Sequence, residues 1–235
     1  MRAIDGKIAI YSYRCIEMSK RYDLIVFDWD GTVMDSTAVI ATSIQSAARD
    51  LNLPIPTDEA ARYVIGMGLS QALRHAIPSA PEELHGALVE RYKHYFLAQD
   101  QSIPLFDHAE NTIRELQQQG FMLAIATGKS RAGLSRVLKT SGIEDCFIAS
   151  RTADETHSKP NPAMLHEIMD ELGVMPERTL MIGDTTHDLQ MAINAGVDAV
   201  GVTHGAHPSE QLRELKPLAL LDDFAQLRDW LRANA

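Results

Sequence analysis

Residues 24–36 read LIVFDWDGTVMDS, an apolar run that ends abruptly at an acid. Asp28 closes the run, which is typical of a buried strand, and a second acid, Asp30, follows two positions later. Ligands of parallel sheets bind beyond the carboxyl ends of the strands, so this ending would put two carboxylates at a binding crevice. Carboxylates about 4 Å apart repel each other by about 4 kcal/mol, and a bound divalent cation is the obvious way to offset that repulsion.

Similar apolar runs recur along the chain and alternate with helical patterns. Strands are expected at 23–27, 122–126, 146–150, 179–183, 198–202 and 218–221, and helices at 107–119, 131–140, 161–172, 186–195 and 223–233. This alternation predicts an α/β fold, Rossmann-like and doubly wound, with a mostly parallel sheet.

One stretch, 36–104, breaks the alternation because it holds helical patterns and no convincing strand. We therefore expect a small all-helical cap domain at 36–104, inserted into an α/β core made of 18–35 and 105–235. Residues 1–17 are expected to be a loosely ordered extension without a role in chemistry.

A second strand end also carries acids. The run TLMIG at 179–183 is followed by Asp184, and Asp188 lies one helical turn later. Hard oxygen ligands of this kind suit Mg²⁺, which keeps several waters and bridges to phosphate. Each acid alone could be a turn former or helix cap, but their joint occurrence at two strand ends favours a metal site.

Two further elements are candidates for binding phosphate. In ATGKS at 126–130, the hydroxyl of Thr127 and the amide of Gly128 can donate hydrogen bonds beside a helix N-terminus. The segment is not a nucleotide-binding P-loop, which would need glycine at position 123, where this chain has leucine. Lys159, just before a proline, would place a cation near the acids, with a plain surface lysine as the alternative.

In combination these residues resemble the haloacid dehalogenase superfamily, in its phosphatase branch with a helical cap after the first strand. The matching elements are, in chain order, DWDGT at 28–32, Thr127, Lys159 and GDTTHD at 183–188. The segments TGK and GVTHG are similar to those of phosphoglycolate-phosphatase-type members. Trp29 departs from the aliphatic residue common between the two acids, and we expect it to pack rather than react.

The resemblance implies a role for each position. Asp28 would be the nucleophile that forms an aspartyl-phosphate, and Asp30 would protonate the leaving alcohol and then activate water. Asp28, the backbone carbonyl of Asp30 and Asp184 would hold Mg²⁺, with Asp188 supporting them. The residues implied in binding the transferring phosphoryl group are Thr127, Gly128 and Lys159.

We therefore expect a Mg²⁺-dependent phosphatase that hydrolyses a small phosphorylated metabolite such as 2-phosphoglycolate. The alternatives are a phosphoglucomutase-like or pyrophosphatase member of the same superfamily, and a non-catalytic binding protein on this fold. A phosphonate hydrolase would need a buried cap lysine, whereas Lys93 lies in a charged helix. True dehalogenases lack the full acid set, which disfavours carbon–halogen cleavage.

No motif identifies the residues that would read the rest of the substrate. The best candidate is IGMGLS at 65–70, whose glycines allow close approach, with a plain turn as the alternative. The cationic candidates in the cap are Arg62, His75, Arg91, Lys93 and His94. Thr57 and Ser70 are expected to be helix N-caps. A zinc site needs three or four converging ligands, and histidines such as His204 and His207 are visible only in pairs.

The composition of the chain limits the kinds of molecule that it is expected to bind. A net charge of −10 over 235 residues disfavours nucleic acid, and no apolar run approaches the length of a membrane span. The two cysteines, Cys15 and Cys146, do not form a disulfide framework, which favours the cytoplasm. We expect a monomer or a homodimer.

Overall fold

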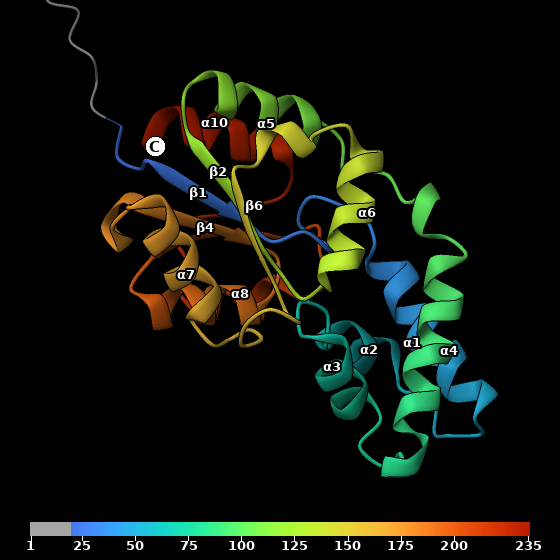
Figure 1. Ribbon diagram of the computed structural model, residues 1–235. Coiled ribbons are helices and arrows are strands. Elements are labelled where there is room, and N and C mark those ends of the chain that lie inside the picture. The colour runs from blue at the N-terminus through green and yellow to red at the C-terminus, as the bar shows by residue number, and fades with distance from the viewer. Residues whose placement is uncertain (1–19) are drawn as a thin grey trace, which may run out of the picture.

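The computed structural model describes residues 20–235, so the expectation for 1–17 lies outside the described residues. Six strands form one sheet in the order β3-β2-β1-β4-β5-β6, and every neighbouring pair is parallel (Figure 1). The strands are β1 Leu24–Phe27, β2 Met122–Thr127, β3 Ala149–Thr152, β4 Thr179–Gly183, β5 Asp198–Val202 and β6 Leu220–Leu221. This order confirms the predicted Rossmann-like, doubly wound fold.

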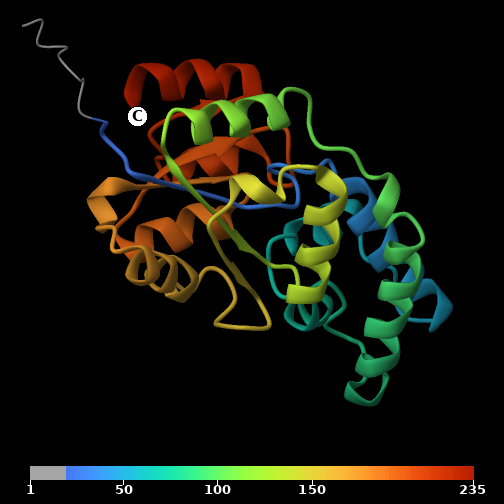
Figure 2. The ribbon, with the colours of Figure 1, turned by 45° about the horizontal axis from the view of Figure 1, so that its top comes forward.

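Helices cover both faces of the sheet. In Figures 1 and 2, α5 and α10 lie on one face, and α7 and α8 lie on the other. The helices of this α/β part are α5 Ala109–Gln118, α6 Arg131–Ser141, α7 Ala163–Leu172, α8 Thr186–Ala195, α9 Ser209–Glu214 and α10 Phe224–Asn234. A sheet enclosed in this way buries its central strands, β1 and β4, on both faces, as their apolar sequence runs require.

The central strand β1 shows how the sequence builds these two layers. Its side chains alternate between the faces, and all four are fully buried. Leu24 and Val26 pack with apolar residues of α7 and α8. Ile25 and Phe27 pack with residues of α5 and α10. A strand anchored on both faces has a fixed register, and the residue that follows it, Asp28, therefore has a fixed position.

Some elements differ from the sequence-based expectations. The third strand begins at Ala149 rather than 146, because Glu144–Cys146 forms a 3₁₀ helix. The last strand is only Leu220–Leu221. Helix α9, Ser209–Glu214, was not expected, and its six residues are too few to give a clear helical period.

Four helices between β1 and α5 lie beyond the carboxyl edge of the sheet (Figure 1), and we call them the cap helices. They are α1 Thr37–Asp50, α2 Asp58–Tyr63, α3 Leu69–Ala76 and α4 His85–Leu97. The chain enters and leaves them through adjacent segments: the amide of Asp35 donates to the carbonyl of Pro104, and that of Phe106 to Val33, both at 3.0 Å. The bounds of the two domains stay a prediction.

The expected N-caps of the cap helices can be compared directly. Thr57 does cap α2, accepting a hydrogen bond from the amide of Ala60 at 3.2 Å. The prediction for Ser70 is wrong, because α3 already begins at Leu69 and Gly68 occupies the cap position. No helix in the described part of the chain is long and apolar enough to cross a membrane.

Candidate active site

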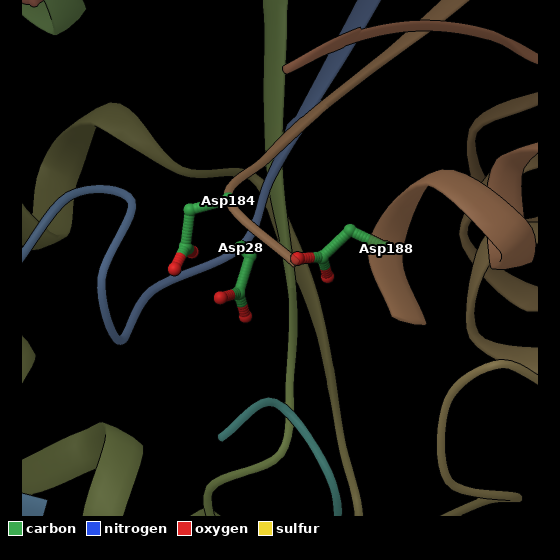
Figure 3. Close-up of side chains that lie close together, drawn as sticks. All are labelled: Asp28, Asp184 and Asp188. Atoms are coloured by element: carbon green, nitrogen blue, oxygen red, sulfur yellow. The ribbon is translucent and has the colours of Figure 1, made fainter. Parts of the chain in front are cut away.

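The carboxyl ends of three neighbouring strands bring predicted site residues together. Asp28 follows β1, Asp184 follows β4, and Thr127 ends β2; β2 and β4 flank β1 in the sheet. Asp188 comes from the first turn of α8. The carboxylates of Asp28, Asp184 and Asp188 point toward one another (Figure 3), with one oxygen of each within 4.8 Å of the others. We call these three residues the acid cluster; all three are fully buried.

A fully buried lysine partly balances the charge of the acid cluster. The Nζ atom of Lys159 lies 2.5 Å from Oδ1 of Asp28 and 2.6 Å from Oδ1 of Asp188. Burial lowers the pKa of Lys159, but the two carboxylates outweigh burial and raise that pKa above its usual value. Lys159 is therefore a permanent cation beside Asp28, and the alternative of a plain surface lysine is wrong.

Both carboxylate oxygens of Asp184 are held by hydrogen bonds from neighbouring residues. Thr32 donates its hydroxyl to Oδ1 at 2.6 Å, and the amide of Ala206 donates to Oδ2 at 2.7 Å. A methyl group at Gly31 would lie 2.3 Å from Oδ2, and one at Gly205 would lie 2.1 Å from it. Only glycine fits at these two positions, because any side chain would displace the carboxylate.

Burial shifts the pKa values of two members of the acid cluster, Asp184 and Asp28. Burial and the charge of Asp188 raise the pKa of Asp184 to about 7. Burial also raises the pKa of Asp28 well above its usual value, although Lys159 opposes this shift. Without a further cation, Asp28 and Asp184 therefore hold protons that exposed carboxylates would release near pH 4.

The acid cluster fits a divalent metal ion. Oδ2 of Asp28 is buried and has no hydrogen-bond partner among residues 20–235, so one oxygen remains available. Three carboxylates face one lysine, which leaves negative charge that a hard cation with oxygen ligands would balance. Asp188 is largely satisfied by the protein: its Oδ2 accepts from the amide of Thr185 at 3.0 Å and from its hydroxyl at 2.6 Å.

Asp30 lies apart from the acid cluster. Its Oδ1 accepts a hydrogen bond from the hydroxyl of Ser36 at 2.7 Å and lies 2.9 Å from Nζ of Lys129. Trp29, between the two acids, is fully buried, and its ring packs edge-on against Phe147 at a centroid distance of 6.3 Å. Asp28 and Asp30 thus have different partners, as their different predicted roles require.

The loop after β2 meets the cap helices closely. The hydroxyl of Thr127 accepts from the amide of Lys129 at 3.1 Å. At Gly128, a methyl group would lie 2.6 Å from the carbonyl oxygen of Gly66 and 2.5 Å from that of Met67. The cap segment 65–70 therefore reaches the phosphate-binding candidates, and glycine at 128 leaves room for it.

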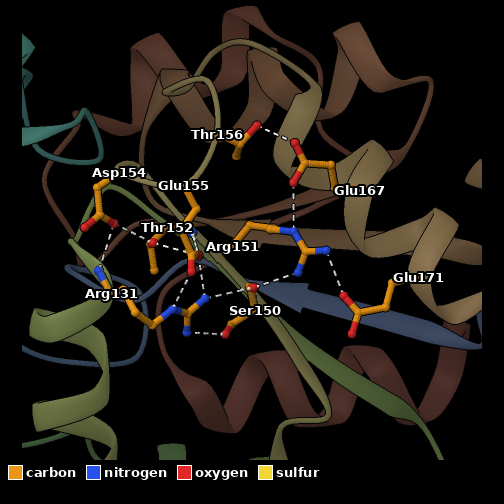
Figure 4. A network of polar contacts seen from close by, with 9 residues as sticks. All are labelled: Arg131, Ser150, Arg151, Thr152, Asp154, Glu155, Thr156, Glu167 and Glu171. Atoms are coloured by element: carbon orange, nitrogen blue, oxygen red, sulfur yellow. Dashed lines mark hydrogen bonds and ion pairs between the residues drawn. The ribbon is translucent and has the colours of Figure 1, made fainter.

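A polar network connects this loop to the loop that carries Lys159 (Figure 4). Arg131, at the start of α6, bonds Glu155 through Nε at 2.9 Å and, through its backbone amide, Asp154 at 2.8 Å. Arg151 on β3 bonds Glu167 and Glu171 of α7. The other members are Ser150, Thr152 and Thr156. Both candidate phosphate loops are thereby fixed to the same framework.

Two histidines of the α/β part hold a cap backbone carbonyl. The Nε2 atoms of His187 and His207 donate to the carbonyl oxygen of Tyr63 at 2.8 and 2.9 Å. Nδ1 of His207 accepts from the amide of Thr186 at 3.0 Å, so its proton is on Nε2. The ring of Tyr63 stacks on His207 at 5.2 Å and on His75 at 5.3 Å.

Sequence reasoning missed some of these residues. The sequence patterns predict no role for Lys129, which lies in ATGKS, or for Tyr63. His207 was weighed only as a metal ligand. Among the cap candidates, Lys93 pairs with Glu90 with 48% of its side chain exposed. A lysine directly after a predicted phosphate loop was the available signal for Lys129, whereas Tyr63 contributes a backbone atom that no motif reveals.

The fold and the residues at its carboxyl edge define a hydrolase, and comparison with known proteins gives its family. A family model described as haloacid dehalogenase-like hydrolase matches residues 25–202, and the chain belongs to this family. The predicted resemblance is thus confirmed.

Similar proteins extend over nearly the whole chain. A probable phosphatase, IndB, of Dickeya dadantii is 35% identical over 212 residues, which cover 87% of this chain and 91% of that protein. A phosphoglycolate phosphatase of Vibrio vulnificus is 31% identical over 221 residues, covering 90% and 97%. The crystal structure of a predicted phosphoglycolate phosphatase from Haemophilus somnus aligns with a TM-score of 0.80 at 28% identity, covering 90% and 98%.

Proposed function

We propose that the protein is a Mg²⁺-dependent phosphatase that hydrolyses the phosphomonoester of a small metabolite. The observation that carries the proposal is the arrangement around Asp28. This carboxylate is fully buried, has one unpartnered oxygen among the described residues, and lies beside a lysine and two further acids. The similar phosphatases from Dickeya and Vibrio support the same activity.

In the first step, the carboxylate of Asp28 attacks phosphorus and the bond from phosphorus to the alcohol oxygen breaks. Asp30 gives its proton to that oxygen as it leaves, and the product on the enzyme is an aspartyl-phosphate. A carboxylate is a poor nucleophile toward a dianion because like charges must approach each other. Lys159, 2.5 Å from Asp28, reduces this repulsion.

In the second step, Asp30 takes a proton from water, and the water oxygen attacks phosphorus. The bond to Asp28 breaks, which releases phosphate and restores the nucleophile. Thr127 and the amide of Gly128 would bind the phosphoryl oxygens through both steps, in a loop that the network of Arg131 holds in place.

The acid cluster would hold Mg²⁺ through Asp28 and Asp184, together with the backbone carbonyl of Asp30, and Asp188 would support this shell. Bound there, the ion supplies positive charge that draws the phosphate and the nucleophile together.

The substrate would then be a small phosphorylated compound, with 2-phosphoglycolate as the candidate suggested by the similar proteins. We further propose a cytoplasmic location, since the one cysteine among residues 20–235, Cys146, is a buried free thiol. For the oligomeric state we propose a monomer or a homodimer.

The test is phosphate release from a panel of compounds by the purified protein with Mg²⁺ and with excess chelator. The panel contains 2-phosphoglycolate, sugar phosphates, nucleotides, pyrophosphate and p-nitrophenyl phosphate. We expect hydrolysis of small phosphomonoesters that stops in chelator and returns when Mg²⁺ is restored. Preferential hydrolysis of pyrophosphate, or conversion of a sugar phosphate to its isomer without phosphate release, would contradict the proposal in favour of another branch of the family.

A further inference from the structure

A second buried cation lies at the boundary between the sheet and the cap helices. The side chain of Lys129 is 8% exposed, and its Nζ lies 2.9 Å from Oδ1 of Asp30. The same Nζ lies 4.8 Å from the ring centroid of Phe96 on α4. Lys129 therefore connects the predicted acid–base residue to the cap side of the site, whereas Lys159 lies among the acid cluster.

The surroundings of Lys129 leave it capacity for another partner. An ammonium group has three N–H donors, and this one faces a single carboxylate oxygen and an aromatic ring. That oxygen is shared, since it also accepts from Ser36. Lys159, by contrast, pairs with one oxygen of each of two carboxylates, those of Asp28 and Asp188. Lys129 is thus the less fully paired cation of the two, in a place where water has little access.

The position of Lys129 in the proposed reaction determines which part of the substrate it can contact. Asp30 donates its proton to the leaving alcohol oxygen, so that oxygen lies next to Asp30 during the reaction. The remainder of the substrate extends from the same oxygen, away from the phosphoryl group held near Asp28. A cation 2.9 Å from Asp30 is therefore adjacent to the alcohol part of the substrate.

The aromatic surroundings strengthen charge recognition at this point. Tyr92 stacks on Phe96 with ring centroids 5.7 Å apart and planes 12° apart, and both belong to α4. Such a wall excludes water, and an ion pair in a water-poor site is stronger than one in solvent. A neutral alcohol group in this position could not form an ion pair with Lys129.

We propose that Lys129 selects substrates carrying a second anionic group, such as a carboxylate, one or two carbons from the ester oxygen. This inference rests on the proposed phosphatase function. It assigns the choice of substrate to a residue of the α/β part that the cap helices enclose. In 2-phosphoglycolate a single methylene separates the ester oxygen from the carboxylate, which suits a cation placed beside Asp30.

The experiment compares two esters that differ only at the distal group, 2-phosphoglycolate and 2-hydroxyethyl phosphate. For the unaltered protein we expect kcat/KM to be at least tenfold higher for 2-phosphoglycolate. In Lys129→Met this preference should fall about 10- to 100-fold, the range expected for the loss of a charged hydrogen bond. Lys129→Arg should keep part of it. Any effect through Asp30 acts on both esters and cancels in the ratio.

The matched control is Lys139→Met, which removes an exposed lysine of α6 and should leave both esters unchanged. Equal losses on both esters in Lys129→Met would overturn the inference and make Lys129 a positioning residue for Asp30. A wild-type ratio near one, with Mg²⁺-dependent hydrolysis intact, would overturn it without any variant and leave the proposed function standing. Hydrolysis of no phosphomonoester by the wild type would refute the proposed function, and this inference with it.

Discussion

The two ends of the candidate site are built in different ways. At the sheet end, the acid cluster and Lys159 are fully buried, and the ends of β1 and β4 fix where two of the acids lie. At the cap end, Lys129 pairs with Asp30 and approaches Phe96 across a boundary between separately formed elements. Strand register decides the first arrangement, and helix packing decides the second.

Their charge balance differs as well. At the sheet end, three carboxylates lie close together and one lysine contacts two of them, so a bound cation is required for full ionisation. At the cap end, one lysine faces one carboxylate, so no bound metal ion is needed there to balance the charge. The difference suggests that the sheet end carries the chemistry, which tolerates little change. At the cap end, Asp30 still takes part in the proposed chemistry, and we expect substitution of Lys129 to change the choice of substrate more than the rate.

The largest expected effect separates the two acids that follow β1, Asp28 and Asp30. Asp28→Asn removes the nucleophile and should reduce turnover of p-nitrophenyl phosphate on the order of 10⁴-fold or more. Asp30→Asn should behave differently with this ester, because p-nitrophenol leaves without needing a proton. The phosphoenzyme then forms but water is not activated, so rapid-mixing absorbance should show a burst of about one p-nitrophenol per active site.

The comparison of the two variants contains its own control. Both change one carboxylate to an amide at positions two residues apart, so a general loss of folding would affect both. A burst in Asp28→Asn, or steady turnover by that variant close to the wild-type rate, would contradict the assignment of the nucleophile. Circular dichroism spectra matching the wild type are the expected folding check.

The second prediction concerns the unbalanced charge of the acid cluster. The pKa of Asp184 is raised to about 7 by burial and Asp188, while an unfolded chain releases this proton near pH 4. The native state therefore binds more protons between these values, and this group lowers the stability of the metal-free protein as pH rises from about 4 to about 7. Mg²⁺ requires the ionised form, so its binding should be roughly 30-fold weaker at pH 5.5 than at pH 8.

Thermal unfolding with and without Mg²⁺ measures this effect without relying on activity. The rise in Tm that Mg²⁺ produces should be clearly larger at pH 8 than at pH 5.5. Asp184→Asn should reduce the rise at both values, whereas Asp170→Asn, at an exposed position of α7, should not. An equal or larger rise at pH 5.5 would show that the acid cluster is not where the ion binds.

The same division explains what could be predicted from the sequence. The expected fold, and the meeting of Asp28 and Asp184, followed from apolar runs and the acids that end them. Parallel strands bring their carboxyl ends to one edge whatever the details of the helices. The burial of Lys159 does not follow from the apolar runs, because it depends on the path of a loop.

The cap end could not be predicted in the same way. That Lys129 faces Phe96 depends on how α4 is placed against the loop after β2, which a helical period does not determine. The contact of His207 with Tyr63 uses a backbone carbonyl, so no residue type signals it. The error at Ser70 has a similar cause, since helix ends are set by local backbone as much as by residue preference.

The smallest expected effect tests the connection between the two parts of the molecule. His207 joins the amide of Thr186 to the carbonyl of Tyr63, and His207→Ala would leave both without this partner. We expect the free energy of unfolding at pH 7.5 to fall by about 2 kcal/mol. Urea denaturation measures it, and His166→Ala, at an exposed position of α7, should change it little.

The pH dependence of that difference distinguishes a specific contact from general loss of packing. Burial lowers the pKa of His207 to about 4, below its usual value of 6.5. The unfolded chain therefore binds the extra proton first, and the wild type loses this part of its stability as pH falls from 6.5 toward 4. The variant has no such group, so the gap between the two proteins should shrink between pH 7.5 and pH 5. A gap of constant size would mean that His207 stabilises the cap helices only through the stacking of its ring on Tyr63.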